Sequence, residues 1–383
     1  MPATSDLAGL VEEMTPHVVE LRRLLHRHPE PSHHEYETTD RVRRFLEGHG
    51  LRFQDRESAT GGWVDIGASP RVGFRADLDA LPITEPSDHP HRSENEGWMH
   101  ACGHDAHTAI AAGIAVILHR LGPRDGVRVI FQPAEESNPG GARDLVSEGV
   151  VDALQGLLAF HVDPGLPVGR IGARSGPITA SGDTVSIVVS GPGGHTSRPH
   201  KTVDLVSAAG RLAAELPGMI RKAVDARSPL VVVFGSIHGG DAANVIPTEV
   251  VVRGTVRTLD PTLWDLLPSL VDKAIDAVLA PTGAGYSLEY RQGIAPVVND
   301  QRLVEMASRS IDSALGPGTV VGTETSMGGE DFSDYLTVTP GALLRLGTEC
   351  GGDDLHSAGF MLDEGSITVG IHAGVAALLG LME

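Results

Sequence analysis

The sequence predicts an α/β protein in which a domain with a mostly parallel β-sheet carries a smaller, inserted α/β domain. Three observations support this fold class. The chain has 383 residues, which exceeds the size at which one hydrophobic core usually stops growing. Strand and helix signals alternate in the first part of the chain, and their order changes near Ser181.

The first segment with clear boundary signals is a helix. Ser32 and Glu35 have the spacing of a capping box, in which two side chains satisfy free N–H groups at a helix start. Gly48 and Gly50 provide the stop signal. We therefore expect a helix from about His33 to Glu47.

The following segments predict a strand, a helix and two further strands. In "RVGFRADLDALP", apolar residues alternate with Arg75, Asp77 and Asp79, so a strand would point both aspartates to one side. After "MHACGHDAHTAIAAG", apolar residues at helical spacing run to Leu121, and Gly122 with Pro123 ends a buried helix of about four turns. The unbroken apolar runs "VRVIF" and "LLAF" are typical of central strands covered on both faces.

Beyond Ser181, six segments follow in the order β-α-β-β-α-β, which is the order of a ferredoxin-like domain. They are "DTVSIVVSG", "DLVSAAGRLAAEL", "LVVVFGSIHG", "EVVVRGTVRT", "WDLLPSLVDKAIDAVLA" and "YSLEYRQG". The predicted domains are therefore residues 1–180 and 292–383 for the larger domain and residues 181–291 for the inserted one.

Polar groups follow the strand-like runs of the larger domain. Open α/β sheets bind ligands at the carboxyl ends of their strands, so we expect these groups to meet. They are Asp77 with Asp79, Glu135 with Glu136, His161, and His356. Cys102 and His104 stand just before the buried helix and can project in one direction. A thiolate, imidazoles and carboxylates together suit Zn, Mn, Co or Ni better than Mg or Ca.

Each of these residues taken singly also has a structural interpretation. Cys102 can be a small buried hydrophobic residue, tandem glutamates are usually solvated, and a histidine at a strand end is usually only hydrogen-bonded. Their conjunction favours a metal site, because burying several uncompensated charges costs several kcal/mol each and a divalent cation compensates them. The structural interpretation is kept for His26, His28, His33, His34, His89, His91 and His119.

Three residues of the inserted domain are candidates for substrate contacts. His195 follows a strand and a glycine-rich stretch in "SGPGGHTSRPH", which would hold it on a tight, exposed turn. Asn244 in "GGDAANVIP" and Arg257 in "RGTVRTLD" are the other two. Turn chemistry and an ordinary surface arginine are the alternative interpretation of these positions.

Composition excludes several classes of partner. With 30 Lys and Arg against 50 Asp and Glu, the net charge of −20 repels nucleic acids and anionic membranes. The first residues do not resemble a signal peptide, and the longest apolar run, Ala109 to Leu118, is about half a bilayer span. Two cysteines make no disulfide framework. We expect a soluble cytoplasmic protein with a small-molecule substrate.

Eight segments, taken in order, resemble the M20 metallopeptidase family, and specifically its amidohydrolase branch of aminoacylases, hippurate hydrolases and auxin-conjugate hydrolases. The segments are "LRRLLHRHPEPSHHEYET", "FRADLDALPI", "HACGHDAHTA", "FQPAEE", "HVDPGLPVG", "GGHTSRPH", "NVIP" and "GEDFSDY". This resemblance implies a metallohydrolase with two metal ions in each subunit, a catalytic domain and a ferredoxin-like lid domain.

The resemblance also implies roles for individual residues. The metal ligands would be Cys102, His104, Glu136, His161 and His356. Glu135 would be the general base, and His195 would support the oxyanion, in many members of the family from across a lid-mediated dimer. Asn244 and Arg257 match positions that contact the substrate carboxylate. We expect Asp77, Asp79 and Asp105 to contact the metal ligands and to hold them in place without binding the metal themselves.

The segment "LHSAGF" departs from the branch, which usually has Asn-Pro after the last histidine ligand, and "MGGEDF" has glycine where serine is common. His161 is followed by Val162 instead of the commoner aromatic residue. These departures concern the substrate preference more than the metal site.

The predicted function is metal-dependent hydrolysis of N-acyl amino acids by an activated water. The alternatives are a dipeptidase or aminopeptidase of the same fold, a cysteine hydrolase that uses Cys102, and an inactive metal-binding relative. The acyl group, the amino acid, the metal and the oligomeric state stay open.

Overall fold

The computed structural model describes residues 4–57, 59–86, 88, 89, 91–123 and 125–383. The chain divides into two compact units by its internal contacts. Unit 1 comprises Met1–Gly176, Val298–Glu324 and Asp331–Glu383, and unit 2 comprises Pro177–Val297 and Thr325–Glu330. The predicted boundaries at residues 181 and 291 stay predictions.

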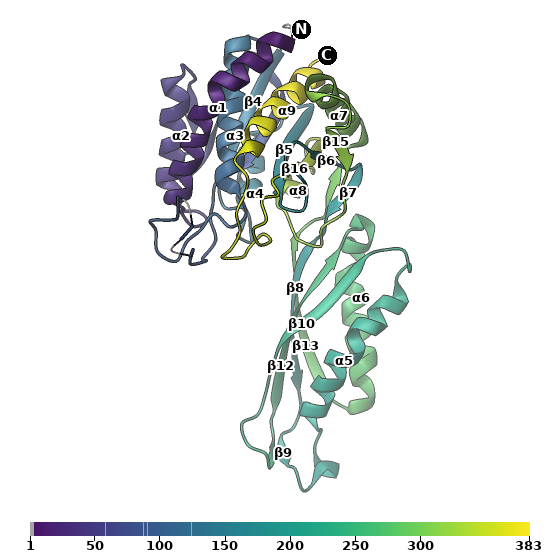
Figure 1. The fold of residues 1–383 in the computed structure, drawn as a ribbon. Coiled ribbons are helices and arrows are strands. Elements are labelled where there is room, and N and C mark those ends of the chain that lie inside the picture. The colour runs from purple at the N-terminus through teal and green to yellow at the C-terminus, as the bar shows by residue number, and fades with distance from the viewer. Residues whose placement is uncertain (1–3, 58, 87, 90, 124) are drawn as a thin grey trace. The chain divides into compact units, whose positions relative to one another are not determined.

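Unit 1 contains an eight-stranded sheet in the order β1-β2-β4-β3-β5-β16-β6-β15 (Figure 1). Strand pairs β4–β3, β3–β5, β5–β16 and β6–β15 are parallel, and the other three pairs are antiparallel. The predicted mixed α/β fold with a large, mostly parallel sheet is therefore confirmed. The strands are β1 Phe53–Asp55, β2 Gly62–Ile66, β3 Ala68–Asp77, β4 Asp125–Gln132, β5 Gly156–Asp163, β6 Ile171–Ala173, β15 Val320–Gly322 and β16 Gly341–Gly347.

The long helices of unit 1 pack on the central strands and on one another. Helix α3 contacts β3 and β4, helix α9 contacts β3, β5 and β16, and α1 packs on both helices. The helices are α1 Thr4–Arg27, α2 Tyr36–Gly48, α3 His104–Leu121, α4 Gly141–Ser147, α7 Gln301–Leu315, α8 Phe332–Tyr335 and α9 Gly365–Leu381. A Cβ at Gly374 would lie 2.3 Å from Ile114 Cδ1, so the absence of a side chain at this position helps α3 and α9 to pack closely.

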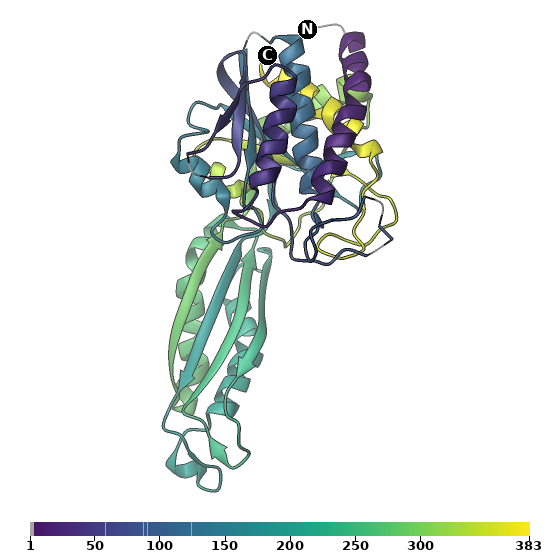
Figure 2. The ribbon, with the colours of Figure 1, turned by 90° about the vertical axis from the view of Figure 1, so that its left-hand side faces the viewer.

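Unit 2 is a four-stranded antiparallel sheet in the order β10-β12-β8-β13. Figure 2 views it from the face opposite to helices α5 and α6, whose apolar sides form the core with the sheet. In chain order the elements are β8 Gly182–Ser190, β9 Gly194–His195, α5 Leu205–Ala223, β10 Leu230–His238, β11 Val245–Ile246, β12 Glu249–Thr258, α6 Pro261–Leu279 and β13 Gly285–Ile294.

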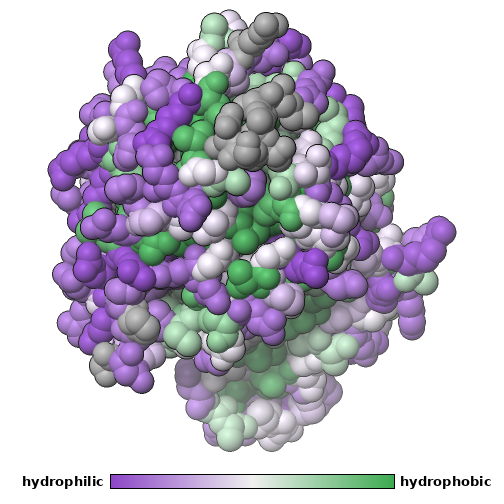
Figure 3. Space-filling view, turned by 45° about the horizontal axis from the view of Figure 1, so that its top comes forward, coloured by the Kyte–Doolittle hydropathy of each residue, from purple (hydrophilic) through white to green (hydrophobic). Residues whose placement is uncertain are grey.

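The remaining elements are short. Strands β7 (Gly176–Thr179) and β14 (Val297–Asn299) lie where the chain passes from one unit to the other, and single 3₁₀ turns span Pro199–Lys201 and Ala280–Thr282. No helix in the described part of the chain is both long enough and apolar enough to cross a membrane. The face drawn in Figure 3 carries hydrophilic side chains around smaller hydrophobic areas.

Two local predictions need correction. Helix α2 begins at Tyr36 instead of His33, and the predicted capping box is wrong. Ser32 Oγ donates a hydrogen bond to Asp79, and the side chain of Glu35 accepts from residues outside the helix. The Glu30 carboxylate instead accepts from the first N–H groups of α2. Contacts with distant segments decided these partners. Helix α3 is also longer than expected, with 18 residues.

Candidate metal centre

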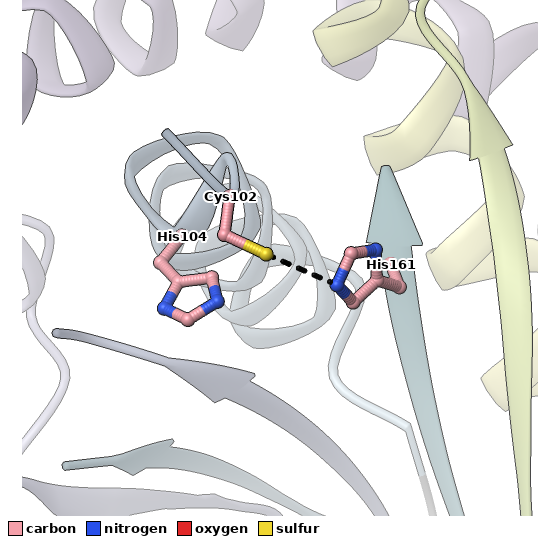
Figure 4. A group of neighbouring side chains, drawn as sticks. All are labelled: Cys102, His104 and His161. Carbon is pink, nitrogen blue, oxygen red and sulfur yellow. Dashed lines mark hydrogen bonds between the residues drawn. The ribbon is translucent and has the colours of Figure 1, made fainter. Parts of the chain in front are cut away.

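The start of helix α3 meets the end of strand β5. Figure 4 shows Cys102 and His104 at the start of the helix and His161 on the strand, with Cys102 Sγ 3.5 Å from His161 Nε2. Gly103, between the first two residues, has a φ of +76°. A Cβ there would lie 2.6 Å from Val162 Cγ2. Only glycine therefore combines this backbone conformation with this close approach.

Both histidines are held in the tautomer that suits a metal ligand. His104 Nδ1 lies 2.9 Å from the backbone oxygen of Asp79, and His161 Nδ1 lies 2.8 Å from that of Val162. A carbonyl oxygen can only accept, so each Nδ1 carries a proton, and in the neutral ring Nε2 then presents a lone pair. A backbone carbonyl behind the ring is the usual partner of a metal-binding imidazole.

The two glutamates lie on a turn that follows strand β4. Carboxylate oxygens of Glu135 and Glu136 each lie 3.9 Å from His104 Nε2, so the turn brings both carboxylates to the same imidazole. Asp79 fixes the turn: its Oδ1 accepts from the Glu135 N–H at 3.0 Å and its Oδ2 from the Glu136 N–H at 2.9 Å.

His356 reaches the group from a loop after strand β16. Its backbone N–H donates to the Ala101 oxygen at 2.8 Å, which joins this loop to the Cys102 turn. Its Nε2 lies 3.2 Å from Glu136 Oε1. The hydrogen bond to Glu136 raises the pKa of His356. Its φ of +59° is unusual for a residue with a side chain, and such strain is common at functional sites.

Asp77 supports the centre through partners that sequence reasoning missed. Its Oδ1 accepts from His107 Nδ1 at 2.7 Å, and its Oδ2 accepts from the buried Arg75 at 2.7 Å. Burial opposes ionisation, but His104, His107 and Arg75 outweigh it and hold the pKa of Asp77 well below its usual range. His107 Nε2 accepts the Val162 N–H at 2.9 Å. Hydrogen bonds of Arg75, Asp77 and His107 thus connect β3, α3 and β5.

The donor set fits a divalent transition metal. His104 Nε2 is buried and forms no hydrogen bond with any described residue. Ligand atoms of Cys102, His104 and His161 lie within 4.8 Å of one another, as do those of Cys102, Glu136 and His356. Burial raises the pKa of the Cys102 thiol to about 12, so a cation is needed to hold it as a thiolate.

Asp105 belongs to a second buried cluster, at the contact between α3 and α1. Its Oδ2 lies 2.7 Å from Arg22 Nε and 2.8 Å from His26 Nδ1. His26 Nε2 lies 2.9 Å from Glu85, which also contacts His89. The sequence did not group His26 or His89 with other site candidates, because their partners are distant in the chain. Arg22 and His26 can balance the two carboxylates, and the cluster joins α3 to α1.

The candidates of unit 2 lie at two ends of its sheet. His195 on β9 and Asn244 beside β11 are exposed neighbours: His195 pairs with Val245, and the Asn244 oxygen accepts from the Thr196 N–H. Arg257 lies near the far end of β12, and its Nη1 donates to the Met327 oxygen at 3.0 Å.

The distance between these two places within unit 2 follows from strand geometry. Strand β9 continues from the end of β8 at Ser190, which pairs with Glu249 at the start of β12 (Figure 1). Arg257 stands eight residues farther along β12 than Glu249. At about 3.3 Å per residue, this separation is about 26 Å. Within one copy of unit 2, Arg257 therefore lies well away from His195.

Comparison with known proteins supports the same chemistry. The model of peptidase family M20/M25/M40 matches residues 73–379. An N-acetylcysteine deacetylase of Bacillus subtilis is 37% identical over 358 residues, which cover 92% of this chain and 93% of that protein. A protein of Rhodococcus jostii named putative glutamate–cysteine ligase 2-3 is 41% identical over 364 residues, which cover 94% of this chain and 46% of that one. The chain thus spans about half the length of this relative.

A solved structure shares the whole fold. The Bacillus subtilis YXEP protein, described as a dinuclear metal binding peptidase from the M20 family, superposes with a TM-score of 0.86 at 33% identity. The superposition covers 97% of this chain and 99% of that one. The protein therefore belongs to peptidase family M20/M25/M40 and is a hydrolase that acts on amide or peptide C–N bonds.

Proposed function

We propose that the protein is a metal-dependent amidohydrolase that cleaves N-acyl amino acids into a carboxylic acid and a free amino acid. The observation that carries this proposal is the group of six donor residues at the carboxyl edge of the unit 1 sheet, where the buried His104 Nε2 forms no hydrogen bond with any described residue. The similarity to an N-acetylcysteine deacetylase supports the substrate class.

Two divalent cations, which we propose to be Mn, Zn, Co or Ni, would be held by five residues. Cys102 belongs to both ligand groups, one with His104 and His161 and the other with Glu136 and His356. When both cations are bound, Cys102 would contribute its thiolate to both groups of ligands. When bound, the cations supply Lewis acidity and lower the pKa of water from about 15.7 to near 7.

Glu135 is the proposed general base. Its carboxylate lies beside His104 Nε2, and its backbone is fixed by Asp79. In this position it takes the proton from the attacking water and then delivers that proton to the leaving nitrogen. The second carboxylate, from Glu136, stays a ligand. Adjacent glutamates on one turn thus divide the two tasks.

In unit 2, we propose that His195 donates a hydrogen bond to the developing oxyanion and that Asn244 and Arg257 bind the substrate carboxylate. The planar guanidinium of Arg257 suits two parallel hydrogen bonds to a carboxylate. One copy of unit 2 cannot bring all three residues to one small substrate, because about 26 Å of strand separates Arg257 from the end that carries His195. This separation supports the proposal that unit 2 is a lid that also forms a homodimer, in which two copies contribute to each site.

A cysteine hydrolase is the rival that the geometry most resembles. His161 Nε2 does present a lone pair to Cys102 Sγ at 3.5 Å, although His161 is distant from Cys102 in sequence. However, reactive cysteines have a lowered pKa and partial exposure. Cys102 is 5% exposed, and burial raises its pKa. The buried thiol therefore favours the metal ligand over the nucleophile.

The deciding experiment measures amine release from N-acetyl, N-benzoyl and indole-acetyl amino acids and from dipeptides, after reconstitution with Mn, Zn, Co or Ni. We expect hydrolysis of N-acyl amino acids, loss of activity with a chelator, and no effect of alkylating agents on the metal-loaded protein. Faster cleavage of dipeptides would favour a peptidase, as YXEP is described. Inactivity on the whole panel would contradict the proposal.

The Glu135→Gln variant separates catalysis from metal binding. We expect it to retain its metal and to lose about 10²- to 10⁴-fold in kcat, the usual contribution of a general base. An unchanged kcat would show that Glu135 is not the general base.

A further inference from the structure

We propose that Glu35 is a positioning residue for the general base, an inference that rests on the proposed function. Glu35 is fully buried, at 0% exposure, and stands just before helix α2. Its side chain does not cap that helix. Its Oε1 instead accepts the backbone N–H of Ala134 at 2.7 Å, across a sequence separation of 99 residues. Ala134 directly precedes Glu135 and Glu136.

Two buried carboxylates, Glu35 and Asp79, together accept hydrogen bonds from three successive backbone N–H groups. Ala134 N–H donates to Glu35, and the N–H groups of Glu135 and Glu136 donate to the two oxygens of Asp79. Successive N–H groups around a left-handed residue form an anion-binding concavity. Here the concavity holds two carboxylates of the protein itself. Glu35 stands just before α2, and Asp79 follows β3.

The turn needs this support because its backbone is strained. Ala134 has a φ of +57°, in the left-handed region that residues with a Cβ seldom adopt. Its oxygen accepts the Gly141 N–H at 3.0 Å, so the residue is held on both sides. Without Glu35 the Ala134 N–H would lose its partner, and the residue would be free to relax. Relaxation would move the neighbouring carboxylate of Glu135.

The ionised form of Glu35 does not stabilise the folded state. Burial raises its pKa to about 7, and the charge of Asp79 adds to this rise, although hydrogen bonds from Thr60 and Ala134 oppose it. A raised pKa means that ionisation of this carboxyl destabilises the folded state at neutral pH. Residues that lower stability concentrate at functional sites. This electrostatic cost agrees with the positioning role, which the geometry of the turn carries.

The test compares Glu35→Leu, Glu35→Gln and a matched control, Glu30→Leu. Glutamine keeps an oxygen that accepts from Ala134 and places its amide opposite Thr60 Oγ1, which lies 2.6 Å from Glu35 Oε2. Leucine removes the acceptor. Glu30 also accepts two backbone N–H groups, those of Glu37 and Thr38, but does not touch the turn.

We expect Glu35→Leu to lower kcat per metal-loaded chain by about 10- to 100-fold, as loss of a supporting partner does at metal sites. KM should change little, Glu35→Gln should restore kcat to within about threefold, and Glu30→Leu should lower only the unfolding temperature. Equal kcat values in Glu35→Leu and wild type, or equal losses in Glu35→Leu and Glu30→Leu, would overturn the proposal.

Hydrogen exchange at the backbone N–H of Ala134 provides a readout that does not depend on activity. Glu35→Leu should speed exchange there, and Glu30→Leu should not. If wild type hydrolyses no substrate, the proposed function fails and the exchange result still decides whether Glu35 holds the turn. Unchanged exchange in Glu35→Leu would refute the hold itself.

Discussion

Asp105 in unit 1 and Asp183 in unit 2 are both buried carboxylates, but their pKa values shift in opposite directions. In unit 1, burial raises the pKa of Asp105, but Arg22 and His26 outweigh it and hold the pKa well below its usual range. In unit 2, burial raises the pKa of Asp183, and its partners Trp264 and Tyr290 are neutral donors that only partly offset this. Unit 1 is therefore organised to keep several charges ionised in its interior.

The candidate site residues of the two units differ in burial. In unit 1, Cys102 and His104 are buried, and their positions depend on hydrogen bonds to other strands and loops. In unit 2, His195 is exposed on the short strand β9 and Asn244 is exposed beside β11. This difference agrees with the proposal that unit 1 holds the metal and the general base and that unit 2 contributes groups that contact the substrate. The three predictions below test this division.

Cys102→Ser should have the largest effect. A serine hydroxyl does not become an anionic ligand as a thiol does, so we expect metal content and activity to fall together. The loss of activity should be at least about 100-fold, the upper range for removing a residue that merely supports a ligand. The measurement is elemental analysis with parallel rates. The exposed Cys350 gives the control, Cys350→Ser, which should change neither quantity. Full metal content in Cys102→Ser would remove it from the ligand set.

His195→Ala should lower kcat by about 10²- to 10³-fold, the usual contribution of one oxyanion donor. Because His195 lies in unit 2, the metal content should stay at the wild-type value. The control is His200→Ala, an exposed histidine on the same loop, which should leave kcat unchanged. Loss of metal from His195→Ala would break the proposed division between the units, and an unchanged kcat would exclude the oxyanion role.

Asp183→Asn should have the smallest effect, on stability alone. Because the folded state raises the pKa of Asp183, the folded state binds this proton more tightly than the unfolded state does. Stability is then lost as pH rises from about 3.9, the unfolded value, through the folded pKa. Asparagine lacks this dependence, so the variant should gain on wild type by a few degrees at most in unfolding temperature over that range.

The measurement for Asp183→Asn is the unfolding temperature of the variant and of wild type between about pH 3 and about pH 8. Asp105 predicts the reverse for unit 1: its lowered pKa contributes stability that is lost as pH falls below about 4. A difference between Asp183→Asn and wild type that does not vary with pH would show that this carboxyl is not destabilised by burial.

Much of the fold follows from local patterns. The apolar runs that became β4 and β5 are buried along nearly their whole length, and Gly122, with a φ of +59°, ends α3 where the sequence placed the stop. The ends of the predicted strands, with the rule that ligands bind at the carboxyl ends of strands, also predicted that Asp77, Glu136 and His161 lie at one edge of the sheet. These features depend on side-chain period and backbone conformation, which a short segment specifies by itself.

The partners of individual polar atoms were decided only by tertiary structure. Ser32 and Glu35 have the spacing of a capping box, yet they bind Asp79 and the Ala134 turn. His26, which looked like an isolated histidine, joins Asp105 to Glu85. Periodicity shows which way a side chain points, but a buried polar atom takes whichever partner the packed chain brings within about 3 Å. That choice depends on segments far apart in sequence, so the sequence of this protein determined the framework of its site and the fold determined its connections.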